Sequence, residues 1–202
     1  MRSTRRLSSW ILAAWLALSG AVAFAQAPTD ATEYQPQVGQ PGKDVIWVPT
    51  SQALIDKMLD VARVRPNDFV IDLGSGDGRT VITAAKRGAQ ALGIEYNPDM
   101  VALSKRNANN EGVSERAQFV KADIFESDLS NATVITMFLL TEINLKLRPK
   151  LLDLKPGTRI VSNTFTMGAW SADGLSWPNK TASTTASPIF GSCRPRSQAV
   201  GG

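Results

Sequence analysis

Apolar side chains recur at two different spacings along the chain, and the two spacings alternate. Over residues 50–64 they recur every three or four positions, which predicts an amphipathic helix capped by Thr50 or Ser51. Residues 69–73 follow as a short apolar run, which is typical of a strand buried on both faces. Residues 76–87 return to helical spacing. The chain therefore begins its regular part as helix, strand, helix.

The same alternation continues as far as residue 163. Further strands are predicted at residues 91–95, 117–121, 132–137 and 159–163. A helix follows the first of these strands, with Asn97 as its cap and Pro98 in the first turn, where a missing N–H costs nothing. Another helix is predicted over residues 139–154. Strands that alternate with helices pair in parallel, so we expect an α/β fold with a doubly wound, mostly parallel, Rossmann-like sheet.

The first 44 residues lie outside this pattern. Three arginines precede an apolar run over residues 10–23, and Ala23 and Ala25 frame a small-x-small cleavage site. These features predict a signal peptide over residues 1–25 and an exported protein, periplasmic or secreted, with no span in the mature chain. An uncleaved membrane anchor is the alternative, although the run is short for a bilayer of about 30 Å. Residues 26–44 are rich in Pro and Gln and predict a linker.

The amino-acid composition mainly excludes certain kinds of catalytic and metal site. The chain has no histidine and a single cysteine, Cys193, so Ser-His and Cys-His catalysis, Cys-rich zinc sites and an internal disulfide are all excluded. We expect no bound metal. The net charge is +4, but three of the basic residues lie in residues 1–25, which leaves +1 for the remainder. The charge therefore gives no argument for a nucleic-acid partner.

The loop between the first predicted strand and its helix carries the most informative motif. Gly74, Gly76 and Gly78 alternate behind Asp72. Glycines at a strand-to-helix turn let the backbone approach a ligand, and the N–H groups of the helix start point towards it. A dinucleotide fingerprint would have its third glycine where Arg79 stands, and a P-loop would need Gly-Lys-Ser/Thr. The spacing fits neither class.

This acidic, alternate-glycine loop resembles motif I of the class I, seven-strand, S-adenosylmethionine-dependent methyltransferases. Two further matches lie on later strand ends in the family's order. Glu95 stands where such enzymes hold an acid on the ribose hydroxyls, and Asp123 where an acid commonly meets the adenine amino group. The resemblance implies methyl transfer with S-adenosyl-L-methionine as cofactor. The cofactor-binding residues that it implies are Thr50, Asp72, Gly74, Ser75, Gly76, Gly78, Glu95 and Asp123.

The resemblance can be narrowed to a group of small single-domain methyltransferases. That group includes the ATP synthase c-subunit lysine methyltransferase and bacterial relatives, and the segments that carry the similarity are residues 48–50, 72–79, 93–98, 147–149 and 154–159. It implies a methyltransferase domain over residues 45–170 and a protein substrate methylated on lysine. It also implies that residues 48–50 fold over the methionine end of the cofactor.

The sequence motifs identify the methyl acceptor less specifically than they identify the cofactor. Residues 137–142 differ from the Asn/Asp-Pro-Pro-aromatic motif of enzymes that methylate the amino groups of bases and glutamine, so we expect no nucleic-acid acceptor. A small-molecule acceptor stays open, because it would share the same cofactor half. Glu142 and Asn144 could orient an amine, but a structural role at a helix start is the simpler interpretation, and no catalytic residue is assigned.

Residues 171–202 change character. They are rich in Ser, Thr, Ala and Pro, and they contain no segment that resembles the last two strands of a seven-strand sheet. We therefore expect a sheet without those strands, and a non-catalytic or truncated cofactor-binding domain as the alternative function. One hypothesis is a frameshift, because reading residues 177–202 two bases later permits an aromatic, β-rich ending. A stop codon in that frame, found by sequencing codons 165–202, would exclude it.

Overall fold

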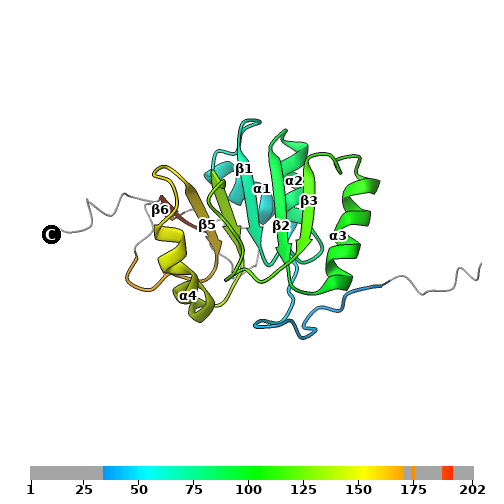
Figure 1. Ribbon diagram of the computed structural model, residues 1–202, viewed down its shortest axis with the longest axis horizontal. Helices are drawn as coiled ribbons and strands as arrows, with labels where there is room; N and C mark the ends of the chain where they lie inside the picture. The colour runs from blue at the N-terminus through cyan, green and yellow to red at the C-terminus, as the bar shows by residue number, and fades with distance from the viewer. Residues whose placement is uncertain (1–33, 171–173, 176–187, 193–202) are drawn as a thin grey trace, which may run out of the picture. The chain divides into compact units, whose positions relative to one another are not determined.

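The structure is a computed structural model that describes residues 34–170, 174–175 and 188–192 (Figure 1). The predicted signal peptide lies outside the described residues, as do most of the tail and Cys193. None of the helices in the described part of the chain has the length and apolar character that a membrane span needs.

Helices and strands alternate along the chain as predicted. The elements are α1 (Gln52–Val61), β1 (Phe69–Leu73), α2 (Arg79–Lys86), β2 (Gln90–Glu95), α3 (Pro98–Asn110), β3 (Ala117–Lys121), β4 (Val134–Met137), α4 (Thr141–Leu152), β5 (Arg159–Asn163), β6 (Gly174–Leu175) and β7 (Pro188–Ser192). The sheet order is β3-β2-β1-β4-β5-β7-β6, and β1 to β5 are parallel (Figure 1). The doubly wound, mostly parallel α/β fold is confirmed, with the strand order reversing between β1 and β4.

The end of the sheet differs from the expectation drawn from the tail. The parallel part stops at β5, as predicted, but two short strands follow it. β7 runs antiparallel along β5 from Arg159 opposite Ser192 to Asn163 opposite Pro188, and the two-residue β6 pairs with β7. No pattern in the sequence predicted β7, because its five residues hold one apolar pair between a proline and a glycine, both depleted in strands.

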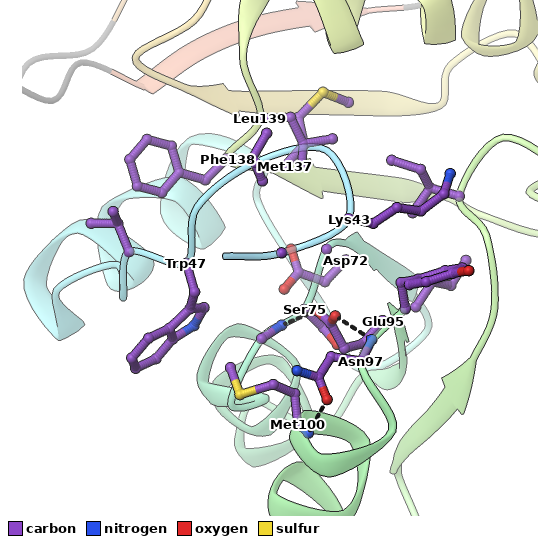
Figure 2. A pocket seen from close by; sticks show the side chains of 18 of the residues that line it. Lys43, Trp47, Asp72, Ser75, Glu95, Asn97, Met100, Met137, Phe138 and Leu139 are labelled. Carbon is purple, nitrogen blue, oxygen red and sulfur yellow. Dashed lines mark hydrogen bonds between the residues drawn. The ribbon is translucent and has the colours of Figure 1, made fainter. Parts of the chain in front are cut away.

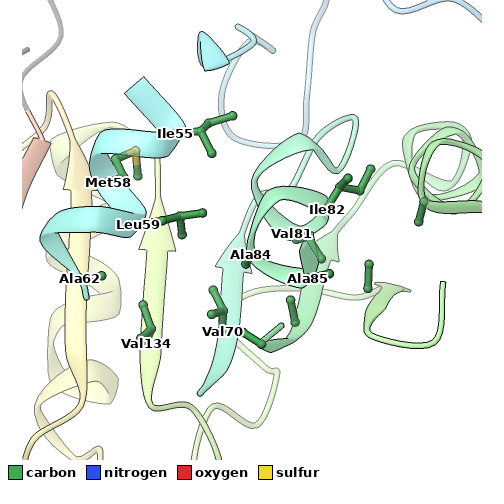
Figure 3. Close-up of a cluster of buried hydrophobic side chains, with 14 of the residues drawn as sticks. Ile55, Met58, Leu59, Ala62, Val70, Val81, Ile82, Ala84, Ala85 and Val134 are labelled. Carbon is green, nitrogen blue, oxygen red and sulfur yellow. The ribbon is translucent and has the colours of Figure 1, made fainter. Parts of the chain in front are cut away.

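The sheet has an apolar core on each face. Successive strand residues point to opposite faces, so Val70 and Val134 pack under α1 and α2, whereas Ile71 and Ile135 pack towards α4. Figure 3 shows the first of these cores, in which Leu59 of α1 and the α2 side chains cover β1 and β4. This two-sided burial explains why the strands are near-continuous apolar runs.

The start of α3 follows the sequence prediction closely. The Asn97 side chain accepts hydrogen bonds from the backbone N–H groups of Asp99 and Met100, and Pro98 occupies the first turn. Because β2 ends at Glu95, Glu95 and Tyr96 lie at the carboxyl edge of the sheet, directly before this cap.

Candidate functional site

A cavity of about 120 Å³ lies at the carboxyl ends of the parallel strands, where the strand order reverses (Figure 2). Ligands of open α/β sheets bind at this position. Of the cofactor residues predicted from the sequence, the cavity lining contains Thr50, Asp72, Gly74, Ser75, Gly76, Glu95 and Asp123. Gly78 is absent from that lining. The structure thus brings together predicted residues from three strand ends and from the segment before α1.

The glycine loop is held against the end of β2. The N–H groups of Gly74 and Ser75 both donate to the Ile94 carbonyl, at 2.9 and 3.1 Å. Gly74 and Gly76 adopt φ values of +75° and +55°, which disfavour any residue with a side chain. A Cβ on Gly76 would stand 2.6 Å from Trp47 Nε1. The bare backbone at Gly76 therefore lets the Trp47 ring lie against the loop, and the two together line the cavity.

Glu95 joins two of the loops that line the cavity. One carboxylate oxygen accepts the N–H of Gly76 at 3.0 Å, and the other accepts the N–H of Asn97 at 2.9 Å (Figure 2). A carboxylate offers about four lone-pair sites, so both oxygens can still accept from hydroxyl groups. Glu95 can therefore fix the glycine loop and receive a ribose diol at once.

Asp72 is an unusual carboxylate, because it is only 6% exposed at the end of a buried strand. Burial raises its pKa to about 7, and the hydrogen bond from Thr136 Oγ1 at 2.6 Å opposes that rise. A buried acid with a raised pKa beside a cavity is a candidate for a ligand-binding group. Its ionised form would suit a cationic ligand.

Asp123 is already paired in this structure. Its Oδ2 accepts from Lys43 Nζ at 2.8 Å, and its Oδ1 accepts the N–H of Phe125 at 2.9 Å. The Lys43 hydrogen bond, with that from Phe125, holds the pKa of Asp123 below its usual range. Lys43 Nζ also lies 5.3 Å from the ring centre of Tyr96 and 5.6 Å from that of Phe125.

The described part of the predicted linker, which supplies Lys43, is folded. Residues 37–47 form a hairpin in which Gly39 N donates to Trp47 O at 2.8 Å and Trp47 N donates to Gln40 O at 2.9 Å. Pro41 and Ile46 form an antiparallel bridge within it. Backbone hydrogen bonds hold this hairpin, so no periodic apolar pattern marks it. The sequence analysis missed Lys43 and Trp47 for that reason.

Thr50 lines the cavity and also accepts a hydrogen bond through its backbone carbonyl. Its carbonyl accepts from Arg79 Nη1 at 3.0 Å, and the Arg79 guanidinium is in turn paired with Asp77. Asp77 Oδ1 also accepts the Arg79 N–H at 3.3 Å, at the start of α2. Arg79, the residue that excludes the dinucleotide fingerprint, thus links the glycine loop to the segment before α1.

Two glycines serve packing rather than ligand approach. A Cβ on Gly78 would stand 2.7 Å from the Phe119 ring and 2.9 Å from Ser104 Cβ. A Cβ on Gly93 would stand 2.5 Å from the Ser75 hydroxyl oxygen. The third glycine of the motif therefore lets α3 and β3 approach the loop, and the Ser75 hydroxyl packs on β2.

Apolar residues line the side of the cavity nearest β4. Met137 and Leu139 are buried, and Phe138 is half-buried and stacks on Phe165 with ring centres 6.0 Å apart. No cluster of His, Cys, Asp and Glu that could hold a metal lies in the described ranges.

Asn144 has the structural role that the sequence analysis favoured. It is buried, and its side-chain amide donates to the carbonyls of Phe165 and Thr166 at 3.1 and 3.3 Å and to Ser162 Oγ at 3.3 Å. It therefore shapes the segment that follows β5. Glu142 is exposed in the first turn of α4.

Comparison with known proteins decides the family. Residues 72–174 match the ANTKMT methyltransferase domain. The chain belongs to this methyltransferase family. It is 47% identical over 130 residues to a protein-lysine N-methyltransferase of Saccharolobus islandicus, covering 63% of this chain and 81% of that protein. It is 34% identical over 128 residues to the human ATP synthase c-subunit lysine N-methyltransferase, covering 63% of this chain but only 54% of that enzyme.

A solved structure supports the cofactor. An enzyme from Salinibacter ruber, described as an RNA methyltransferase and crystallised with S-adenosylhomocysteine, is 41% identical with a TM-score of 0.69 over 74% of this chain and 95% of that one. The chain is thus an S-adenosylmethionine-dependent methyltransferase, as its motifs predicted. The residues present fit the cofactor, because the cavity is bordered by the bare backbone of Gly74 and Gly76, and Asp72, Glu95 and Asp123 supply acceptors along it.

Proposed function

We propose that this methyltransferase modifies the ε-amino group of a lysine in a protein. The observation that carries the proposal is the 47% identity to the archaeal enzyme, which is named a protein-lysine N-methyltransferase and of which the chain covers 81%. The animal relatives that share 32–34% identity are also named for lysine methylation.

Methyl transfer requires the protein mainly to position the two reactants and to exclude water from the site. The bound cofactor supplies a sulfonium methyl group, whose carbon bonds to an uncharged amine in line as its bond to sulfur breaks. The chain holds the cofactor with the glycine loop and Glu95. Met137, Phe138 and Leu139 present apolar surface on the β4 side, which disfavours the ammonium form of an incoming lysine and keeps water away.

The end of β4 and the residues that follow it favour an alkylamine acceptor over a nucleobase. The sequence from Met137 to Leu140 is wholly apolar and offers no side chain that would hydrogen-bond the edge of a base. An alkylamine needs only an apolar channel for its methylene stem. The Salinibacter ruber relative is described as acting on RNA, so RNA is the competing acceptor in the test.

The test is transfer of a labelled methyl group by the full chain. Purified enzyme is given labelled S-adenosylmethionine together with a protein extract and, separately, total RNA. We expect label in protein, sensitive to protease and located on lysine by peptide mass spectrometry. Label confined to RNA would contradict the proposal. Gly76→Arg fills the cofactor loop and controls for contaminating enzymes, whereas Lys105→Ala, on the exposed face of α3, should act like the wild type.

A further inference from the structure

Lys43 stands among the groups that would recognise the adenine ring of the cofactor. Asp123 follows β3, Tyr96 follows β2, and Phe125 lies two residues beyond Asp123. An acid that accepts from the adenine amino group and aromatic rings beside it are what such a base requires. The Lys43 ammonium contacts all three of these residues.

We propose that Lys43 is an internal occupant of the adenine subsite and competes with the cofactor for Asp123. The inference rests on the cofactor site and is independent of the proposed lysine acceptor. One oxygen of Asp123 is committed to the Phe125 N–H at 2.9 Å, and the other accepts from Lys43 Nζ at 2.8 Å. Oδ2 has a second lone pair, but the Lys43 ammonium, which also lies over the Tyr96 and Phe125 rings, occupies the space in front of Oδ2 that an adenine amino group would enter.

The hairpin aims Lys43 at this position. Lys43 lies in the tight turn of the hairpin, closed by a hydrogen bond from Gly42 N to Val45 O at 2.9 Å. Figure 2 shows Lys43 reaching over the cavity from this turn. A Cβ on Gly42 would meet the Val45 carbonyl oxygen at 2.3 Å, so the turn is built for glycine and for this direction of the chain.

A second carboxylate, that of Asp44, can pair with the Lys43 ammonium when adenine displaces it from Asp123. Its ammonium lies 3.4 Å from the carboxylate of its neighbour Asp44, in addition to the 2.8 Å contact with Asp123. Displacement would move the ammonium from one carboxylate to another without leaving it unpaired. The Lys43 and Asp123 side chains are 32% and 21% exposed, so the pair that must break is partly hydrated and weak.

The competition sets a measurable penalty on cofactor affinity. A partly exposed ion pair and two exposed cation–π contacts together account for a change of about three- to tenfold in a binding constant. The chain as it stands should therefore bind S-adenosylhomocysteine about three- to tenfold more weakly than a variant without this ammonium.

The experiment is calorimetric titration of S-adenosylhomocysteine into the full chain and its variants. Lys43→Ala and Lys43→Met should both bind about three- to tenfold tighter, and Lys105→Ala should match the wild type. In an Asp123→Ala background the gain from Lys43→Ala should shrink, because the competed oxygen is gone. Unchanged or weaker binding by folded Lys43 variants would overturn the proposal, since weaker binding would make Lys43 a cofactor ligand.

Two measurements keep the test decisive if the Lys43 variants fold poorly. Asp44→Ala removes the second partner of the ammonium and should weaken binding by strengthening its hold on Asp123. Raising the salt concentration from about 50 to about 500 mM screens the ion pair and should tighten binding to the wild type. Opposite responses would overturn the proposal. Binding is measured without an acceptor, so a failure of the lysine-methylation proposal would leave these results unaffected.

Discussion

The backbone N–H of Gly76 donates to the Glu95 carboxylate over 3.0 Å, so the glycine loop after β1 is fastened to the end of β2. The same carboxylate lines the cavity, so the group that holds the loop in place is also exposed to a bound ligand. The conformation of the glycine loop and the binding of a ligand therefore both depend on the Glu95 carboxylate.

Glu95→Ala should weaken S-adenosylhomocysteine binding by about tenfold or more, because it removes charge-assisted hydrogen bonds to two loop N–H groups as well as an acceptor for the ligand. Glu95→Gln keeps the shape but replaces one acceptor oxygen with an amide donor, so its affinity should lie between those of Glu95→Ala and the wild type. Calorimetric titration measures both. Glu115→Ala, an exposed acid before β3, is the matched control. Equal affinity of Glu95→Ala and wild type would show that the loop needs no such clamp.

Gly76→Ala should weaken cofactor binding at a modest cost in stability, because the loop or Trp47, which both line the cavity, must shift. Its φ of +55° costs an alanine about 1–2 kcal/mol, and the new Cβ would clash with Trp47 Nε1 at 2.6 Å. Gly157→Ala is a control for the strain alone, because Gly157 has φ +90° and open space around it. In urea unfolding Gly76→Ala should lose at least as much stability as Gly157→Ala, because the contact with Trp47 adds to the strain, and titration with S-adenosylhomocysteine should show weaker binding for Gly76→Ala alone. Intact binding by Gly76→Ala would remove the steric argument.

The raised pKa of Asp72 predicts a loss of stability as pH rises. The folded state favours the neutral acid, so the stability that this group contributes is present below its unfolded pKa of about 4 and is lost as pH climbs to about 7. Asp72→Asn removes the titration, and its melting temperature should exceed that of the wild type at pH 8 but match it at pH 4. Thr136→Val, which removes the hydrogen bond to the ionised form, should deepen the loss. Parallel pH profiles for Asp72→Asn and wild type would contradict the assignment.

Asp68 should act in the opposite direction at low pH. Burial opposes its ionisation, but hydrogen bonds from Thr133, the Arg65 N–H and Arg159 outweigh burial and hold its pKa below the usual range. Its stabilising effect is therefore present at neutral pH and lost as pH falls below about 4.

Asp68→Asn should lower the free energy of unfolding at pH 7 by about 2–3 kcal/mol, because it leaves the Arg159 guanidinium without its carboxylate at the junction of α1 and β5. The difference from wild type should shrink at pH 3. Urea unfolding at the two pH values measures it, with Glu115→Gln as the control. An equal difference at both pH values would show that the carboxylate charge is not the cause.

Most of the fold could be predicted from the sequence, because the parallel strands are buried on both faces and so form continuous apolar runs. The strands at residues 117–121 and 159–163 and the Asn97 cap agree with prediction at their boundaries. The family's acids at strand ends also indicated Glu95 and Asp123, and both line the cavity, while their contacts with the cofactor stay a prediction.

What the sequence could not indicate is structure held by the backbone or by contacts between distant segments. The hairpin over residues 37–47 rests on main-chain hydrogen bonds, so its Pro- and Gln-rich composition suggested only a linker. The packing role of Gly78 depends on Phe119 and Ser104, which are remote in the chain. The pairing of Lys43 with Asp123 spans 80 residues and leaves no local pattern.

The hairpin also determines where the chain can be truncated or fused without loss of the cofactor cavity. The recognisable family segment begins at residue 72, but one wall of the cofactor cavity and the helix that covers the core beside Val70 come from residues 40–61. A version shortened to the family segment would lose the tryptophan above the glycine loop and expose the apolar face under α1. Domain exchange or fusion within this family should therefore place its junction ahead of Tyr34 rather than at the first glycine of the loop.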